Sequence, residues 1–136
     1  MTDRRDDGKS VMTRRQLIDF CLTFPLAYED YPFDDITDAG AWTVIRHHVN
    51  KKSFALIYER SGKLFVNLKC DPMEAEFLRQ AFADVTPAYH MNKVHWNTVA
   101  SGGDVPEDIL RRMIERSYDL IKPKVRKDKK TNEKGR

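Results

Sequence analysis

Apolar positions in the first quarter of the chain recur with helical spacing. The stripe occupies i, i+3, i+4 and i+7 and is formed by Leu17, Phe20, Cys21 and Phe24. Thr13 and Gln16 precede it with the spacing of a capping box, in which each side chain satisfies a free amide at the helix start. Pro25 is expected to end this helix.

Three β-branched and aromatic stretches follow an acidic link at 28–35. They predict strands over 42–49, 53–59 and 64–69. The last stretch alternates, so its side chains should point to two opposite faces of a sheet. One face receives Leu64, Val66 and Leu68, and the other receives Phe65, Asn67 and Lys69. The short connections predict antiparallel hairpins.

A second helix should begin after Asp71, a good N-cap, with Pro72 at its first position and Glu74 completing the capping box. These roles account for Asp71 and Pro72 without any catalytic function. The expected inner face of this helix is Phe77, Leu78, Ala81 and Phe82.

Two short strands, over about 86–90 and 94–100, fit the next segment, and Pro87 restricts the first to an edge or a strand start. Asp104 and Glu107 should cap a third helix. Its apolar stripe is Leu110, Met113, Ile114, Ser117 and Ile121, with Ile109 beside it. The resulting order α-β-β-β-α-β-β-α predicts a two-layer α+β fold, with a five-stranded antiparallel sheet and helices on one face.

Length and charge then divide the chain of 136 residues into three parts. We expect a flexible N-terminus at 1–12, one domain at 13–122 and a basic, disordered tail at 123–136. Residues 122–136 carry a formal charge of +6 and residues 1–12 are neutral, so 13–121 carry −3 of the total of +3. The basic character therefore lies in the tail, and a nucleic-acid-binding face of the domain would have to be local.

The segment Y-H-M-N-K-V-H-W-N-T-V at 89–99 concentrates the side chains that could take part in chemistry. A catalytic centre, a metal site, a nucleic-acid surface and a polar hairpin are all conceivable. His90 and His95 stand at i, i+5, which places them on opposite faces of a strand, and no cysteine or carboxylate lies between them. No motif of an activated nucleophile, phosphate loop or dinucleotide site occurs. We therefore expect no enzyme activity, metal or cofactor.

Nucleic-acid contacts suit the same segment better. Lys93 could meet a phosphate, Asn92 and Asn97 could pair with base edges, and Tyr89 or Trp96 could stack on bases. The outward row Phe65, Asn67 and Lys69 carries similar chemistry. The structural alternative has Tyr89 and Trp96 covering the core while His and Asn side chains close a turn. On chemistry alone, this alternative is the stronger.

Five phrases resemble the YjbR/MmcQ family of small bacterial proteins, in the order of that family and over about residues 13–122. They are D-Y-P-F (30–33), F-A-L-I (54–57), V-N-L-K-C-D-P (66–72), V-T-P-A-Y-H-M-N-K-V-H-W-N-T-V (85–99) and R-S-Y-D-L-I (116–121). The signature positions are Tyr31, Pro32, Phe33, Asp71, Pro72, Tyr89, His90, Trp96 and Thr98. The chain departs from the family pattern in two loops, with Asp34 after Pro-Phe and with Asn50-Lys51-Lys52 in place of Gly-Gly-Lys.

The resemblance implies a CyaY-like or secretion-chaperone-like α+β fold. Members are commonly labelled DNA-binding, partly because the fold resembles a double-wing domain of a phage transcription factor. This is an analogy of fold, which does not determine function.

The main hypothesis is a DNA-binding or transcription-associated module. Its contacts are expected from Lys51, Lys52, Asn67, Lys69, Asn92, Lys93, His95, Asn97 and the tail residues Lys124, Arg126 and Lys127. One alternative is a module that binds an unidentified protein or peptide through the sheet face or the D-Y-P-F loop. Another is a small-ligand or catalytic pocket beside the 89–99 hairpin, with His90 or His95 exposed in it.

We also expect a cytoplasmic monomer. No apolar run approaches the length of a membrane span, no secretory signal is evident, and Cys21 and Cys70 lack the spacing of a redox or metal motif. Cys21, on the apolar stripe of the first helix, is expected to be an inert core thiol.

Overall fold

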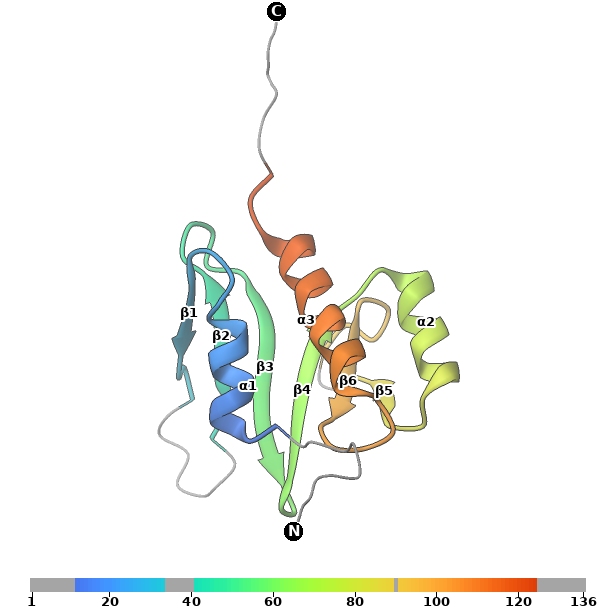
Figure 1. Ribbon diagram of the computed structural model, residues 1–136. Coiled ribbons are helices and arrows are strands. Elements are labelled where there is room, and N and C mark those ends of the chain that lie inside the picture. The colour runs from blue at the N-terminus through green and yellow to red at the C-terminus, as the bar shows by residue number, and fades with distance from the viewer. Residues whose placement is uncertain (1–11, 34–40, 90, 125–136) are drawn as a thin grey trace, which may run out of the picture.

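The computed structural model describes residues 12–33, 41–89 and 91–124. Within them the chain forms three helices and six strands (Figure 1). Their bounds, in chain order, are α1 Arg14–Cys21, β1 Ala27–Asp30, β2 Thr43–His47, β3 Ser53–Arg60, β4 Lys63–Lys69, α2 Pro72–Ala81, β5 Val85–Pro87, β6 Trp96–Ala100 and α3 Glu107–Ile121. The α+β class and the antiparallel sheet are as predicted.

The sheet has the strand order β1-β2-β3-β4-β6-β5, and every pairing is antiparallel. The prediction of five strands was wrong because β1 lies in the segment taken as an acidic link. The charged residues Glu29 and Asp30 interrupt the apolar pattern from which a strand is predicted. Its pairing with β2 is supported instead by arginines from elsewhere, since Arg15 of α1 bonds Glu29 and Arg46 of β2 bonds Asp30.

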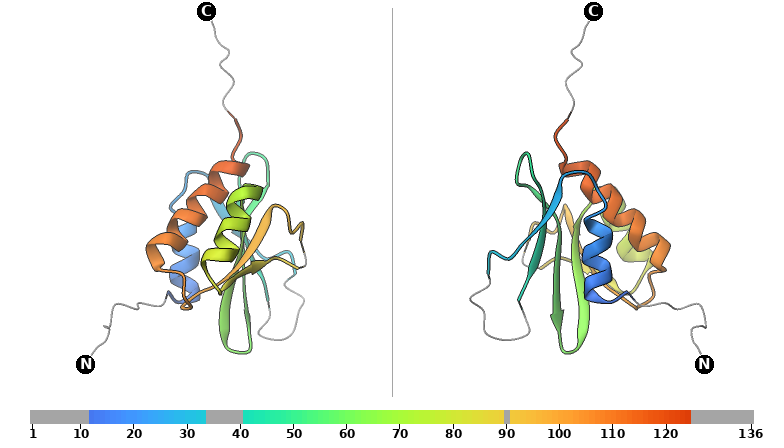
Figure 2. Two further views of the ribbon diagram at one scale, coloured as in Figure 1. Left: turned by 90° about the vertical axis from the view of Figure 1, so that its right-hand side faces the viewer. Right: turned by 60° about the vertical axis from the view of Figure 1, so that its left-hand side comes forward.

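The three helices cover one face of the sheet and leave the other face without a helix (Figure 2, left). The core lies between the two layers and includes the predicted stripe of α3, from Leu110 to Ile121, as well as Leu17, Val66 and Leu68. Met12, placed with the N-terminus by sequence, is buried in this core. We call the two surfaces of the sheet the helix-covered face and the open face.

The N-cap residues of α1 and α2 were predicted correctly, and that of α3 was not. Thr13 and Gln16 form the expected capping box, and Asp71 accepts from the amides of Met73 and Glu74. Asp104 does not cap α3. Its carboxylate accepts from the backbone N–H groups of Ala83 and Asp84, at 2.7 and 3.0 Å, and Pro106 occupies the cap position.

Three other boundaries or faces differ from the prediction. Helix α1 ends at Cys21 rather than near Pro25. The side chain of Glu74 bonds Arg116 instead of completing a capping box. The buried residues of α2 are Ala75 and Leu78, whereas Phe77 is 66% exposed.

Strands β5 and β6 are shorter than predicted because the chain turns tightly between them. The N–H of Met91 donates to the carbonyl of Ala88, and the N–H of His95 donates to that of Asn92. The described residues of this connection, 88–89 and 91–95, project on the open-face side of the sheet, away from the helices (Figure 2, left). We call them the 88–95 connection.

Candidate functional site

Asn97 was predicted to contact base edges, and the structure contradicts this. It lies on the helix-covered face of β6, opposite Leu68 of β4, and is 0% exposed. Arg79 Nε donates to its Oδ1 at 2.7 Å, and its Nδ2 donates to the carbonyl of Ala75 at 3.3 Å. Both ends of the amide are thus used to fasten α2 to the sheet.

Asn67 does lie on the open face, as the alternation of β4 predicts, but it is not the exposed contact residue expected there. It is 2% exposed. Thr98, its partner across β4 and β6, donates to Asn67 Oδ1 at 2.6 Å. In the part of the chain that the structure describes, the Nδ2 group has only a contact of 3.5 Å with the sulfur of Met91, which comes from the 88–95 connection.

Lysines from four segments lie toward one end of the domain. Lys51 and Lys52 lie in the β2–β3 turn, Lys69 ends β4, Lys93 lies in the 88–95 connection, and Lys124 follows α3. We call these five residues the basic end. Figure 1 shows the β2–β3 turn, the start of α2 and the end of α3 on the same side of the molecule.

Two hydrogen bonds join these segments. Asn50 Nδ2 donates to the carbonyl of Ile121 at 2.8 Å, which fixes the β2–β3 turn against the end of α3. The N–H of Cys70 donates to the carbonyl of His95 at 2.7 Å, which fixes the end of β4 against the 88–95 connection. Sequence predicted these lysines as contacts but could not show that they share one end.

The carboxylates near the basic end are already engaged. Glu74 pairs with Arg116 at 2.7 Å and Asp119 pairs with Lys122 at 3.0 Å. Asp71 accepts from two amides of α2. Among the described residues, none of the five lysines pairs with a carboxylate, so their charges are available to a partner.

The remaining positions of the 89–99 segment have mixed roles. Asn92 Oδ1 accepts from the N–H of Val94 at 3.0 Å and closes a turn. His95 and Trp96 are half-buried, and Lys93 lies 5.8 Å from the ring of Tyr89. His90, Arg126 and Lys127 lie outside the described residues.

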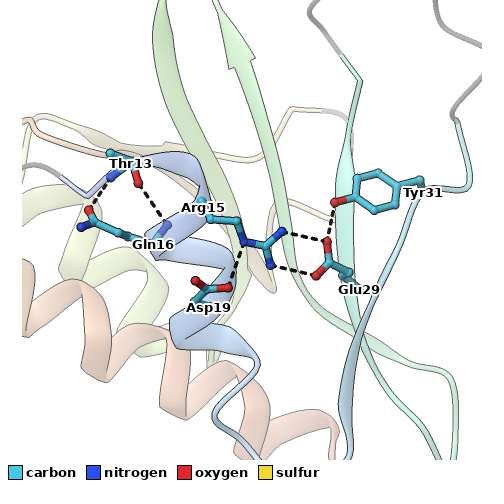
Figure 3. A network of polar contacts seen from close by, with 6 residues as sticks. All are labelled: Thr13, Arg15, Gln16, Asp19, Glu29 and Tyr31. Carbon is cyan, nitrogen blue, oxygen red and sulfur yellow. Dashed lines mark hydrogen bonds and ion pairs between the residues drawn. The ribbon is translucent and has the colours of Figure 1, made fainter.

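The signature residue Tyr31 stabilises the edge of the sheet. Its hydroxyl donates to Glu29 Oε2 at 2.5 Å, and Arg15 Nη2 donates to Glu29 Oε1 at 2.9 Å (Figure 3). The bond from Arg15, supported by that from Tyr31, holds the pKa of Glu29 below its usual range. Pro32 and Phe33, which follow, are exposed.

Chemistry based on a metal or a thiolate finds no support in the described part of the chain. No group of three or more His, Cys, Asp or Glu side chains there is placed to hold a metal ion. Burial raises the pKa of the Cys21 thiol to about 12 and that of Cys70 to about 11, so both thiols are protonated near neutral pH. None of the described helices combines the length and apolarity needed to cross a membrane.

The open face carries a hollow of about 160 Å³ beside the 89–99 hairpin, the place named in one of the alternative hypotheses. It is lined by Tyr58, Arg60, Phe65, Asn67, Thr86, Pro87, Tyr89 and Thr98. A pocket was expected beside this hairpin with His90 or His95 in it, but His95 is not among the lining residues. The usable signal was the alternation of β4 and β6, which places Phe65, Asn67 and Thr98 on one face.

Comparison with known proteins agrees with the fold and the quoted phrases. A family model described as YjbR matches residues 22–120. The chain belongs to the YjbR family. It is 33% identical to Uncharacterized protein YjbR of Escherichia coli strain K12 over 107 residues, which cover 79% of this chain and 85% of the relative. It is 31% identical to Uncharacterized protein YyaQ of Bacillus subtilis over 103 residues, covering 68% and 84%.

Solved structures similar to this YjbR-family chain share the fold. A crystal structure of a Pseudomonas syringae protein matches with a TM-score of 0.70 and 30% identity, covering 82% of this chain and 100% of that one. A crystal structure of a Deinococcus radiodurans protein matches with a TM-score of 0.70 and 34% identity, covering 88% and 81%.

Proposed function

We propose that this YjbR-family domain binds DNA through phosphate contacts made by the basic end, without a chemical step of its own. The convergence of five lysines from four segments supports this proposal. Lysine is a point charge suited to phosphate, and such contacts give affinity without reading sequence. The charge of −3 over residues 13–121 does not oppose them, because the carboxylates nearest the basic end are paired or capping.

Strong sequence preference is not expected. Asn97 is committed to α2 and Asn67 is almost fully buried, so neither side chain can meet the base edges of a stacked duplex. Asn92 uses its side-chain oxygen to close its own turn. Binding should therefore depend mainly on charge, with the +6 of residues 122–136 adding to it.

Fluorescence anisotropy with a labelled duplex tests the proposal as a salt titration starting near about 50 mM. The double variant Lys52→Gln/Lys124→Gln should weaken binding and reduce the slope of log affinity against log salt by about 2. The matched control Lys63→Gln/Arg112→Gln removes the same charge from exposed positions outside the basic end. It should leave both quantities nearly unchanged.

Truncation after Lys124 separates the domain from the tail. The truncated chain should still bind DNA near about 50 mM salt, more weakly than the full chain. Loss of all binding on truncation, or equal effects of the two double variants, would overturn the role of the basic end.

A protein-interaction module is the second candidate, and α2 supplies the observation that favours it. Met73 is 83% exposed and Phe77 is 66% exposed, and at i, i+4 they are neighbours on the outer surface of the helix. The variant Phe77→Ser should abolish stoichiometric capture of a protein partner while leaving DNA binding unchanged. If capture persists in this variant, α2 is not the contact surface.

A further inference from the structure

The hollow on the open face combines aromatic rings with polar groups and one cation. Tyr58, Phe65 and Tyr89 supply the rings, Asn67 and Thr98 supply the polar groups, and Arg60 supplies the charge. No carboxylate is among the lining residues that the structure describes. At about 160 Å³ the hollow is smaller than the pockets of roughly 300–1,000 Å³ that hold drug-sized ligands, so it suits a single small ring system.

The aromatic part is preformed. Trp42 and Tyr58 stack with their centroids 4.2 Å apart at 15°, and Tyr58 stacks on Phe65 at 5.5 Å and 21°. These rings come from three segments and brace one another, so their positions are fixed before any ligand arrives. Tyr89 differs from them, because it is 67% exposed and leaves more than half of its surface to pack on a ligand.

The polar part has unused hydrogen-bonding capacity. Asn67 is almost fully buried, yet within the described residues its Nδ2 group donates only to a thioether sulfur 3.5 Å away, which is a weak acceptor. Buried amide N–H groups normally have better partners. Its Oδ1 accepts from Thr98, and that bond fixes the orientation of the amide.

The charged part is available as well. Arg60 lies 5.5 Å from the Tyr58 ring and is exposed. Within the described residues it pairs with no carboxylate. A guanidinium in this position can form a charge-assisted, bidentate hydrogen bond with a phosphate.

We infer that the hollow binds one nucleotide unit. The base packs against Phe65 and Tyr89 and accepts a hydrogen bond from Asn67 Nδ2, and the phosphate pairs with Arg60. The unit comes either from a free mononucleotide or from a single-stranded nucleic acid. This inference does not depend on the basic end, whose phosphate contacts need no base.

The test measures ligand-induced NMR shifts of the Asn67 side-chain amide and the Thr98 amide. The probes are adenosine monophosphate, adenosine, inorganic phosphate and a single-stranded adenine decamer. Adenosine monophosphate or the decamer should shift both signals, adenosine should bind about tenfold more weakly, and inorganic phosphate should leave them unchanged. Response to the mononucleotide alone identifies a free nucleotide, and response to the decamer alone identifies a single strand.

Two pairs of variants assign the contacts. Tyr89→Ala and Arg60→Gln should each weaken binding of the responding probe by about tenfold. Their controls are Phe77→Ala, an aromatic of equal exposure outside the hollow, and Lys63→Gln, the partner of Arg60 in the β3–β4 hairpin. Each control should bind as the parent does.

The inference fails if none of the nucleotide probes shifts the two signals, or if the controls weaken binding as much as the variants. Duplex binding by the Arg60→Gln variant keeps the two sites distinguishable. If only the hollow is wrong, this variant and the parent bind duplex DNA alike. If only the basic end is wrong, Lys52→Gln/Lys124→Gln still binds the nucleotide probe as the parent does.

Discussion

The two faces of the sheet hold their polar side chains differently, although the same strands supply both. Asn97 and Asn67 lie on neighbouring strands and are both buried, yet among the described contacts only Asn97 has strong partners at both ends of its amide. On the open face, Asn67 has one strong bond and one weak contact with sulfur. Complete pairing on the helix-covered face fits a structural role, and the incomplete pairing on the open face is the feature on which the proposed nucleotide site rests.

The aromatic residues follow the same division. Phe54 is fully buried and contacts the rings of Phe24 and Tyr118 from the helical layer. Phe65, on the open face, is half-buried and stacks only on Tyr58 among the rings described. The first contributes to the core, and the second forms part of a surface.

The largest expected effect tests this division. Phe54→Ala should lower the free energy of unfolding by about 3–5 kcal/mol, because it leaves a cavity in the core. Phe65→Ala should lower it by less than about 2 kcal/mol, because the ring is already partly in water. Urea denaturation of both variants provides the measurement. Equal losses would show that the open face is as much a part of the core as the helix-covered face.

The asparagines provide the next test. Asn97→Ala should cost about 2–3 kcal/mol, because it removes the partner of Arg79 and one bond to α2. Asn67→Ala should cost about 1 kcal/mol, because one strong bond is lost. Urea denaturation provides the comparison, with both variants expected to show the same dependence of the free energy of unfolding on urea concentration. A larger cost at Asn67 would mean that its amide is more fully satisfied than the contacts show.

The features that sequence predicted well have causes within a few residues. The capping box of Thr13 and Gln16, the cap at Asp71 and the stripe of α3 all depend on local spacing. The alternation of β4 likewise placed Phe65, Asn67 and Lys69 on one face. These patterns predict which way a side chain points.

What lies over a side chain could not be predicted. Asn67 and Asn97 were expected at the surface, and neither the 88–95 connection over the first nor α2 over the second is encoded beside them. Strand β1 was missed for the same reason, since Arg15 and Arg46 come from other elements. The hollow depends on residues from four strands and a connection, so alternation could indicate its face but not its concavity.

Lys51 allows binding and stability to be separated at the basic end. Its φ of +64° is a left-handed conformation that costs a residue with a Cβ about 1 kcal/mol relative to glycine. Its ammonium lies 5.4 Å from the ring of Tyr28, on the open-face side. Lys51→Gly should therefore leave the free energy of unfolding unchanged or raise it by up to about 1 kcal/mol, while weakening DNA binding.

Thermal denaturation and the same salt titration with duplex DNA provide the two measurements for Lys51→Gly. The control Ser61→Gly changes another turn residue with a positive φ, +54°, outside the basic end. It should give a similar change in stability with unaltered binding. Stronger DNA binding by Lys51→Gly would contradict the role of this lysine.

The smallest expected effect concerns pH and the edge of the helix-covered face. Glu29 has a folded-state pKa below its unfolded value of about 4.3, mainly because Arg15 donates to it and secondarily because Tyr31 does. Its stabilising contribution is thus fully present above about pH 5 and is lost as pH falls through the folded-state pKa. Glu29→Gln should lower the melting temperature by about 1–3 °C at pH 7. It should differ less from the parent at pH 3, because the parent carboxylate is then largely protonated.

Asp30→Asn, which alters the adjacent ion pair with Arg46, serves as the comparison on the open face. A gap between Glu29→Gln and the parent that widens toward low pH would contradict the assigned direction of the pKa shift.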